Sequence, residues 1–292
     1  MDVSIIIVNY NTKETTKQCI DSIVEKTKGV EYEIILVDND SEDGSKALFL
    51  MDHRIVFVES NKNLGFGKAN NLGFTKAKGK YIFLLNSDTI LVNDAVSMLY
   101  DKMEHADENV ACIGSYLYNQ EMNPNQSFGR YLTISRCLKG CLMTYVKKFF
   151  PISSFEFWGN FEDYMDVEMI IGADLFVRRQ VIEKYGMFNP SFFMYHEEND
   201  MQRRFAMNGY KNQLVKGPKI IHLENVSSAT MSSMRKKIMG ETGMFTYMRI
   251  WNKKYAYVMF KYAFLLLKLP ILFDKKYSLK DKFTYLKFIC RQ

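Results

Sequence analysis

Oxygen-bearing side chains gather where one apolar run of the sequence ends. Residues 81–85 are apolar and lead directly into Asn86, Ser87 and Asp88. A hard divalent cation prefers oxygen ligands, and a bound diphosphate can supply most of them, so one protein carboxylate with one or two further side-chain oxygens suffices. Asp88 is therefore a candidate cation ligand. The alternative is that Asp88 or Thr89 caps a helix that follows.

Two earlier apolar runs end in the same way. The first, 3–8, is followed by Asn9 and Tyr10, and the second ends at Asp38 and Asn39. The carboxylate of Asp38 could accept the N3–H of a pyrimidine while the amide of Asn39 bonds its carbonyl groups. An Asx turn explains the same two residues without a ligand, so both interpretations stay open.

The densest acidic cluster is Glu197, Glu198 and Asp200, which follows the apolar and aromatic residues 192–195. The positive end of a helix dipole favours acids in the first turn, and this accounts for one of the three. A carboxylate against aromatic side chains loses hydration, which raises its pKa and makes it a stronger base. The cluster is therefore also a candidate source of a general base.

A lone histidine, His222, ends an apolar stretch late in the chain. Such a histidine is more often structural than a ligand, so its role depends on whether the fold brings it to Asp88. The other histidines are too scattered for a helix-borne zinc pair, and Cys137 and Cys141 lack the second Cys/His pair of a zinc site. The five cysteines are expected to be reduced and mostly structural.

These clusters need a scaffold that brings distant segments together. The runs 3–8, 33–37, 55–58 and 81–85 lack polar alternation and are separated by segments with helical spacing. Such runs are typical of a parallel sheet with helices on both faces, in which ligands lie beyond the carboxyl ends of the strands. Helices are expected at 15–26, 44–51, 69–77, 95–104 and 179–185, further strands at 169–177 and 219–223, and an irregular insertion over the site at 119–165.

Charge is spread unevenly along the 292 residues, whose net charge is +6. From Trp251 onward, ten Lys or Arg stand against two Asp, a net charge of +8, whereas residues 1–250 carry 29 basic and 31 acidic residues, a net charge of −2. A near-neutral body argues against a nucleic-acid groove, and the basic C-terminal part is expected to meet something anionic.

The C-terminal segment 255–273 is apolar and aromatic but contains Lys261, Lys268 and Pro270. Its 19 residues are marginal for crossing a bilayer. Three interpretations stay open: helices packed on the rest of the protein, a basic and aromatic surface lying on an anionic membrane, or a transmembrane helix.

Six segments occur in the order seen in family 2 glycosyltransferases: VSIIIVNYN, IILVDNDSEDGS, NKNLGFGKANNLGF, YIFLLNSDTIL, IIGADLFVRR and FFMYHEENDMQRR. The chain resembles the rhamnosyltransferase-like subgroup, which builds bacterial surface polysaccharides such as capsule and O-antigen. The resemblance implies an α/β GT-A fold with a mostly parallel central sheet flanked by helices. It implies a catalytic domain at 1–225, divided into a nucleotide-binding half (1–118) and an acceptor half (119–225), and a helical, basic and aromatic membrane-proximal region at 226–292.

The resemblance also assigns roles by position. Residues implied to hold the nucleotide sugar are Val8, Asn9, Tyr10, Asp38, Asn39, Asn70, Asn86 and Ser87. Asp88 matches the last acid of the family's Asp-x-Asp motif, whose first acid is Asn86 here. His222 matches the late histidine of the metal shell, which implies a divalent metal, Mn²⁺ or Mg²⁺.

Glu198 takes the position of the catalytic base, with Glu where the family usually has Asp, and Glu197 and Asp200 are lesser candidates. Asp174 departs from the family, which mostly has a small or apolar residue there. It is expected either to contact the acceptor or to cap a turn.

The resemblance implies an inverting transfer of a sugar from a nucleoside diphosphate donor, dTDP-rhamnose or a UDP-hexose, to a hydroxyl of a lipid-linked or growing bacterial surface glycan. The alternatives are a non-catalytic glycan-binding or scaffold homologue and a nucleotidyltransferase, although the latter needs a glycine-rich loop where residues 9–12 have no glycine. Expected partners are the donor, the acceptor and a membrane surface met by 251–292, with no nucleic acid; a homodimer stays open. Met1 and Asp2 lead directly into an apolar run, so no signal peptide is expected, and the expected location is cytoplasmic, peripheral at the inner face of the membrane.

Overall fold

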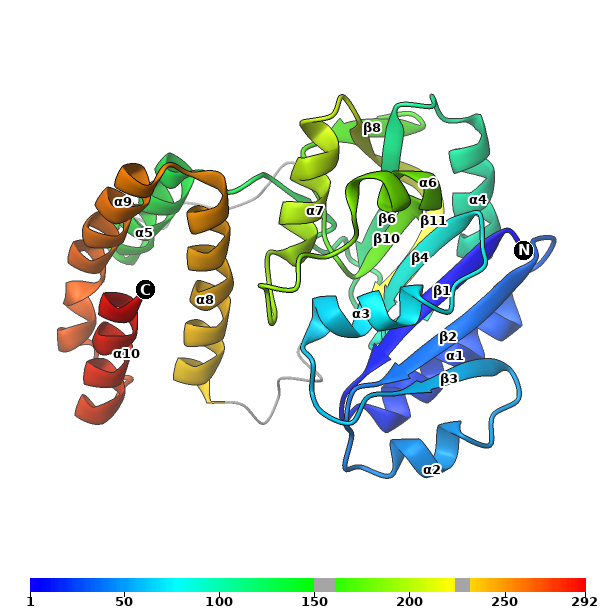
Figure 1. Ribbon diagram of the computed structural model, residues 1–292, viewed down its shortest axis with the longest axis horizontal. Helices are drawn as coiled ribbons and strands as arrows, with labels where there is room; N and C mark the ends of the chain where they lie inside the picture. The colour runs from blue at the N-terminus through cyan, green and yellow to red at the C-terminus, as the bar shows by residue number, and fades with distance from the viewer. Residues whose placement is uncertain (150–160, 224–231) are drawn as a thin grey trace. The chain divides into compact units, whose positions relative to one another are not determined.

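The computed structural model of the protein describes residues 1–149, 161–223 and 232–292. They form two compact units (Figure 1). The first, here called the sheet unit, lies within residues 1–131 and 161–229. The second, here called the helical unit, lies within 132–160 and 230–292.

The sheet unit is built on a nine-stranded sheet in the order β3-β2-β1-β4-β10-β6-β11-β5, with β8 paired to β11. Its strands are β1 (Val3–Asn9), β2 (Tyr32–Asp38), β3 (Ile55–Glu59), β4 (Tyr81–Asn86), β5 (Thr89–Leu91), β6 (Val110–Tyr118), β8 (Tyr164–Val167), β10 (Asp174–Arg178) and β11 (Lys211–His222). Strands β1 to β4 are parallel, and β6 and β11 run the same way because β10 is antiparallel to both β4 and β6. The expected α/β fold with a mostly parallel sheet is confirmed.

Helices cover both faces of this sheet, as the unbroken apolar runs predict. Successive side chains of a strand point to opposite faces. Ile5 therefore belongs to a core that contains Ile20 of α1 (Lys13–Lys26) and Leu99 of α4 (Ala95–His105). Ile6 belongs to the opposite core, which contains Phe205 of α7. Other helices of this unit are α2 (Ser45–Phe49), α3 (Phe66–Phe74), α6 (Arg179–Tyr185) and α7 (Glu197–Ala206).

Three segments differ from expectation. Strand β11 runs from Lys211, not from 219, because a register shift between Val215 and Lys219 absorbs Gly217 and Pro218, residues that read as a strand break. The expected strand at 169–177 is divided into β9 (Met169–Ile170) and β10. An irregular insertion is expected at 119–165, but part of it, α5 (Ile134–Phe149), is a regular helix that belongs to the helical unit. Residues 150–160 of that expectation lie outside the described residues.

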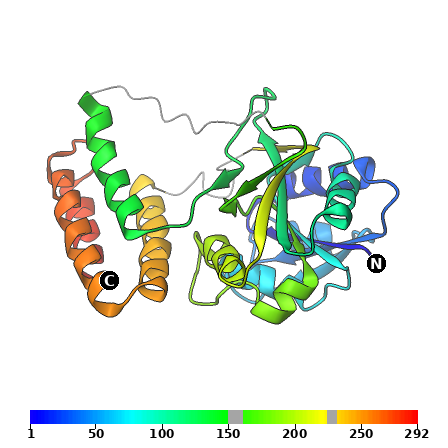
Figure 2. The ribbon, with the colours of Figure 1, turned by 90° about the horizontal axis from the view of Figure 1, so that it is seen from above.

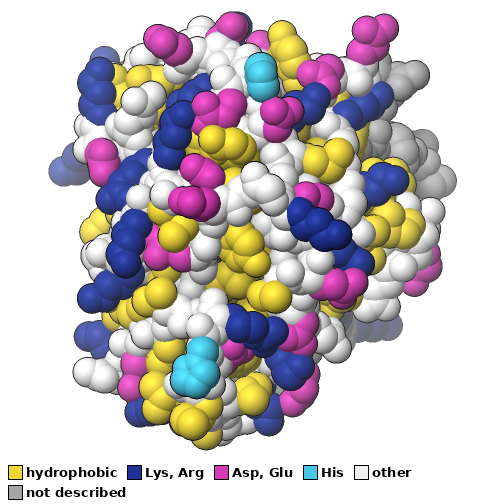
Figure 3. Space-filling model, turned by 90° about the vertical axis from the view of Figure 1, so that its right-hand side faces the viewer, with side chains coloured by type: hydrophobic (Ala, Val, Ile, Leu, Met, Phe, Trp, Pro, Cys, Tyr) yellow, Lys and Arg dark blue, Asp and Glu magenta, His cyan; other side chains and the backbone are white. Residues whose placement is uncertain are grey.

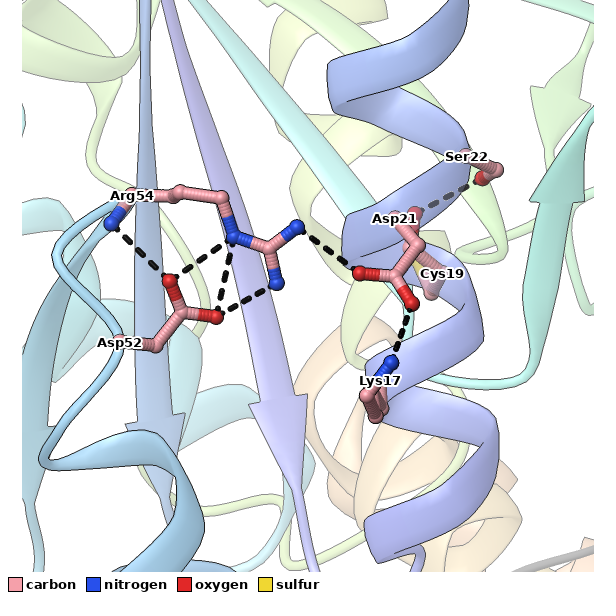
Figure 4. Close-up of polar contacts among 6 residues, drawn as sticks. All are labelled: Lys17, Cys19, Asp21, Ser22, Asp52 and Arg54. Carbon is pink, nitrogen blue, oxygen red and sulfur yellow. Dashed lines mark hydrogen bonds and ion pairs between the residues drawn. The ribbon is translucent and has the colours of Figure 1, made fainter.

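An exposed ion-pair network ties α1 to the turn before β3 (Figure 4). Arg54 bonds Asp52 at 2.7 Å and Asp21 at 2.8 Å, and Asp21 also bonds Lys17 at 2.6 Å. Each exposed pair of this kind contributes about 0–1 kcal/mol. On the face shown in Figure 3, basic and acidic side chains are interspersed, in keeping with the near-neutral charge of residues 1–250.

The helical unit consists of α5, α8 (Ser233–Trp251), α9 (Lys254–Lys268), the 3₁₀ helix η1 (Leu269–Phe273) and α10 (Leu279–Arg291). Its core is aromatic and includes Phe245, Phe260, Phe264 and Tyr285. Helix α5 packs beside α9 (Figures 1 and 2). The hydroxyl of Ser278 caps α10 by accepting the N–H of Asp281; a side-chain oxygen at this position satisfies one of the unpaired N–H groups of a helix start.

Candidate active site

The polar clusters that end three apolar runs meet at one edge of the sheet. In the register of β1, Asn9 pairs with Asp38 of β2, and Val8 pairs with Asn86 of β4. Because parallel strands present their carboxyl ends at the same edge, clusters far apart in sequence become neighbours there. Asn86 also donates its N–H to the carbonyl of Ala173 at 3.0 Å, so the segment before β10 joins the same edge.

The side chain of Asn9 is the centre of a buried hydrogen-bond network. Its Nδ2 donates to Asp38 Oδ1 at 2.7 Å and to Ser41 Oγ at 3.0 Å. Its Oδ1 accepts from the hydroxyls of Thr12 at 2.8 Å and Thr16 at 2.9 Å. With 0% exposure, the Asn9 side chain holds the surrounding loops together. A direct contact between Asn9 and a nucleotide stays a prediction.

Asp38 and Asn39 also brace loops. Asp38 Oδ2 accepts the N–H of Ser41, three residues on, at 3.2 Å, which stabilises the loop after β2. Asn39 accepts the N–H of Leu64 at 2.9 Å and donates to Asn63 at 3.1 Å, which fixes the loop before α3. Binding of the nucleotide base by this pair stays a prediction.

Four further residues implied to bind the nucleotide sugar differ in access. Asn70 is buried and donates to the carbonyl of Phe66 within α3, at 3.0 Å. Ser87 is buried, with its Oγ 3.1 Å from the hydroxyl of Thr12, and Val8 is half-buried. Tyr10 is the exposed one of these four, at 37%, so its ring is the one most open to a ligand.

Asp88 and His222 meet in space. The distance from Asp88 Oδ1 to His222 Nε2 is 3.3 Å, and Asn86 Nδ2 lies 3.4 Å from the same nitrogen. The contact exists because β5 follows Asp88 and pairs antiparallel with β11, which sets Thr89 opposite His222. A strand in this place also shows that the helix-cap interpretation of Asp88 is wrong.

These donors fit a divalent cation of the Mn²⁺ type. A carboxylate oxygen and an imidazole nitrogen 3.3 Å apart suit such an ion. Among the described residues, no group of three or more His, Cys, Asp or Glu side chains has the arrangement of a complete metal shell. A cation held by Asp88 and His222 would therefore take its remaining ligands from a diphosphate or water.

Three carboxylates at the start of α7 have different surroundings. Asp200 is buried and pairs with Arg204 at 3.0 Å, which gives it a structural partner. Glu197 is 2% exposed, and burial together with the charge of Glu198 raises its pKa to about 8. Burial also raises the pKa of Glu198, which is half-buried. Glu198 alone among the three combines a raised pKa with access to solvent, which favours it as the base.

Glu198 is linked to the edge that carries Asp88 by a short series of contacts. A Cβ added to Gly172 would lie 3.8 Å from the Cβ and Cγ of Glu198, and the next residue, Ala173, accepts the N–H of Asn86. Tyr195 and His196, just before α7, both have left-handed backbone, with φ of 70° and 72°. Non-glycine residues rarely adopt this backbone conformation, and it recurs at functional sites.

Asp174 lies beneath this edge. It is 0% exposed and is the first residue of strand β10, so its carboxylate lies inside the fold, and its two expected roles, acceptor contact and turn cap, stay predictions. Its Oδ2 accepts the hydroxyl of Ser115 at 2.6 Å and the N–H of Ser115 at 2.7 Å. Burial raises the pKa of Asp174 from 3.8 to about 7, an effect partly offset by Ser115 and His222.

Asp174→Asn is expected to change how stability depends on pH. The pKa is higher in the folded state, so the stabilisation from the bound proton is complete below about pH 4 and is lost as pH rises through about 7. Between about pH 5 and about pH 8, the wild type should lose about 3 kcal/mol relative to the variant. Urea unfolding of both proteins at the two pH values measures this difference. A wild-type-minus-variant difference that stays constant with pH would contradict it.

Several residues of this site carry no strong signal in the sequence. Thr12, Thr16 and Ser41 were not identified as site residues, although a hydroxyl three residues after Asn9 is a common turn pattern. Ser115 lies in β6, a strand that the sequence pattern did not suggest. The left-handed backbone of Tyr195 and His196 is not evident from the sequence, because only a few per cent of non-glycine residues adopt it, although His does so more often than most.

Known proteins that resemble this chain are glycosyltransferases. The chain is 32% identical over 130 residues to glycosyltransferase GlyG of Streptococcus pneumoniae, covering 43% of this chain and 42% of that protein. It is 22% identical over 297 residues to the cholesterol galactosyltransferase of Borreliella burgdorferi, covering 97% of this chain and 79% of that protein. The chain spans less than half the length of the first curated relatives it matches.

Among solved structures, the fold is similar to that of GalNAc-T7, crystallised with UDP, GalNAc and Mn²⁺, with a TM-score of 0.58 at 14% identity over 88% of this chain and 49% of that one. This likeness shows the GT-A fold. The model of the family described as "Glycosyl transferase family 2" matches residues 4–186, which span β1 to α6 and include Asp38, Asp88 and Asp174. That match covers more than half of the sequence, and the chain belongs to glycosyl transferase family 2.

Proposed function

We propose that this protein is an inverting glycosyltransferase that moves a sugar from a nucleoside diphosphate sugar to a hydroxyl of a lipid-linked or growing bacterial surface glycan. Family membership supports sugar transfer as the reaction class. The observation that carries the proposal is the contact between Asp88 and His222, 3.3 Å apart at the edge of the sheet where three polar strand ends meet.

In the proposed reaction, Glu198 takes the proton of the acceptor hydroxyl as that oxygen attacks the anomeric carbon. The bond from this carbon to the diphosphate oxygen breaks, the electron pair leaves with the diphosphate, and the configuration at the carbon inverts. A divalent cation at Asp88 and His222, Mn²⁺ or Mg²⁺, would supply positive charge to the leaving diphosphate. Glu197, which is buried, is proposed to support Glu198 and not to act as the base itself.

The proposed donor is dTDP-rhamnose or a UDP-hexose. Asp38 and Asn39 lie buried at the ligand edge, where the lone pairs left on their side-chain oxygens would accept from a pyrimidine base, and Tyr10, the residue after Asn9, is exposed. The structure of GalNAc-T7 with UDP and Mn²⁺ supports a pyrimidine nucleotide with a metal in this fold.

A donor screen tests the proposal. Purified protein with Mn²⁺ is expected to release nucleoside diphosphate from one or a few members of a panel of nucleotide sugars, because water can replace the acceptor slowly. The Glu198→Gln variant is the matched control and should release much less. Release from none of the donors, with or without a glycan acceptor, would favour the scaffold alternative.

We also propose that the protein works at the cytoplasmic face of the membrane, since a lipid-linked acceptor would be presented there. The basic C-terminal part, with its net charge of +8 from Trp251 onward, supports a location near anionic lipid.

A further inference from the structure

Helix α9 and the adjoining 3₁₀ helix η1 expose one row of large apolar side chains. Tyr255, Met259, Tyr262, Leu266 and Phe273 are 65%, 70%, 57%, 66% and 86% exposed. Successive members are separated by three, four or seven residues, so within the helix they lie along a single face. We call these five residues the α9 face. Exposed apolar rows of this kind mark contact surfaces.

The opposite side of α9 is already occupied. Tyr257, Phe260 and Phe264 are 8% exposed or less, and all three pack against Phe245 of α8. The α9 face is therefore separate from the core of the helical unit, and covering it requires something other than the helices on which α9 packs.

By length and composition the segment Lys254–Phe273 could cross a bilayer, since it has 20 residues with a mean hydropathy of 1.6. Crossing would require the packing on Phe245 to be dismantled and would draw Lys261 and Lys268 into lipid. Lys268 forms an ion pair with Glu241 at 3.4 Å within the helical unit. A helix with one side held in a protein core and the other exposed instead suits a position in the plane of the membrane surface.

The positive charge around the α9 face favours an anionic partner. Exposed basic residues flank it on both ends: Lys253, Lys254, Lys275, Lys276 and Lys280. Each Lys near an anionic lipid surface contributes about 1 kcal/mol of attraction. A second copy of the chain would instead bring two basic surfaces with a net charge of +8 together, which like-charge repulsion opposes.

We propose that the α9 face lies in the headgroup region of an anionic phospholipid bilayer, with α9 parallel to the membrane plane. Tyr255 and Tyr262 sit at headgroup level, where aromatic rings with a polar tip are favoured. Met259, Leu266 and Phe273 enter the acyl boundary. The inference rests on the proposed membrane location and adds the surface, its orientation and the lipid class.

Vesicle flotation tests this proposal. The wild type is expected to float with vesicles of phosphatidylglycerol and phosphatidylcholine, and much less with phosphatidylcholine alone. The triple variant Met259→Ser, Leu266→Ser, Phe273→Ser should lower partitioning by more than about tenfold, since each substitution removes apolar surface that would be buried in the bilayer. Raising salt to about 0.5 M should also weaken binding by screening the lysines.

A matched triple variant controls for loss of exposed apolar side chains in general. Leu50→Ser, Met51→Ser, Met207→Ser changes residues of the sheet unit that are 60%, 71% and 72% exposed, and it should float like the wild type. Circular dichroism confirms that each variant is folded.

Three results would overturn the proposal: equal flotation of the two triple variants, no flotation of the wild type, or resistance of the bound protein to alkaline extraction, which marks a spanning helix. Sedimentation showing a dimer that only the α9-face variant disrupts would assign the surface to a second copy instead. Glu198→Gln should float normally, so failure of the transferase proposal and failure of this one give different results.

Discussion

Glu198→Gln is expected to lower sugar transfer by about 10²- to 10⁴-fold, the usual contribution of a general base. The amide keeps the size of the side chain but cannot accept the acceptor's proton. Donor binding should stay close to that of the wild type, because the proposed role of Glu198 on α7 is toward the acceptor hydroxyl, whereas the nucleotide is expected at the ends of β1, β2 and β4. Single-turnover kinetics and calorimetry with the donor measure the two effects separately.

Glu197→Gln is the matched control for this prediction. Glu197 is 2% exposed, so it is poorly placed to meet an acceptor, and its substitution should reduce turnover less than that of Glu198. Wild-type turnover in Glu198→Gln would show that the base is assigned wrongly, and a larger loss in Glu197→Gln would reverse the two roles. Because the two carboxylates interact, the pH–rate profile reports apparent pKa values of the pair.

Asp88→Ala is expected to remove most of the metal dependence of nucleotide binding. Loss of groups that merely surround a metal ligand costs about 10- to 100-fold in affinity, so loss of the carboxylate itself should cost at least about 100-fold in Mn²⁺ affinity. Calorimetry with nucleoside diphosphate, with and without Mn²⁺, measures this. Binding without the metal should not weaken, since Asp88 would repel a bare diphosphate.

His222→Ala should weaken the same metal-dependent step, because its Nε2 faces Asp88 at 3.3 Å. Glu42→Ala serves as the control, as Glu42 is an exposed acid in the loop after β2 and has no expected part in holding a cation. Unchanged Mn²⁺-dependent binding in Asp88→Ala would contradict the assignment of Asp88 as a metal ligand. A loss of equal size in Glu42→Ala would show that net charge alone controls binding.

The sheet and its ligand edge follow from local patterns in the sequence. Runs such as 3–8 are mostly apolar on both faces and stop at a polar residue. Neighbouring residues alone therefore predict both the strand and the position of its end. The meeting of Asn9, Asp38 and Asn86 then follows from parallel pairing alone. The contact of Asp88 with His222 was implied by the family resemblance and depends on β5 pairing with β11.

Other features depend on contacts that no local pattern contains. Strand β10 runs antiparallel to β4, and this alone carries Asp174, its first residue, to the ligand edge. Strand β11 continues through Gly217 because neighbouring strands hold it there. Burial likewise distinguishes Glu197 from Glu198. Both are glutamates in adjacent positions, but Glu197 is buried and Glu198 is half-buried.

The network centred on Asn9 has a consequence for the thermodynamics of catalysis. It joins β1 to Asp38 and Ser41 and, through Thr12, to Ser87 beside Asp88. These loops are thus preorganised before any substrate arrives, and the entropy of ordering them is lost on folding instead of on association. More of the intrinsic binding energy can then stabilise the transition state, in which the glycosidic bond is partly broken, and this accelerates the reaction.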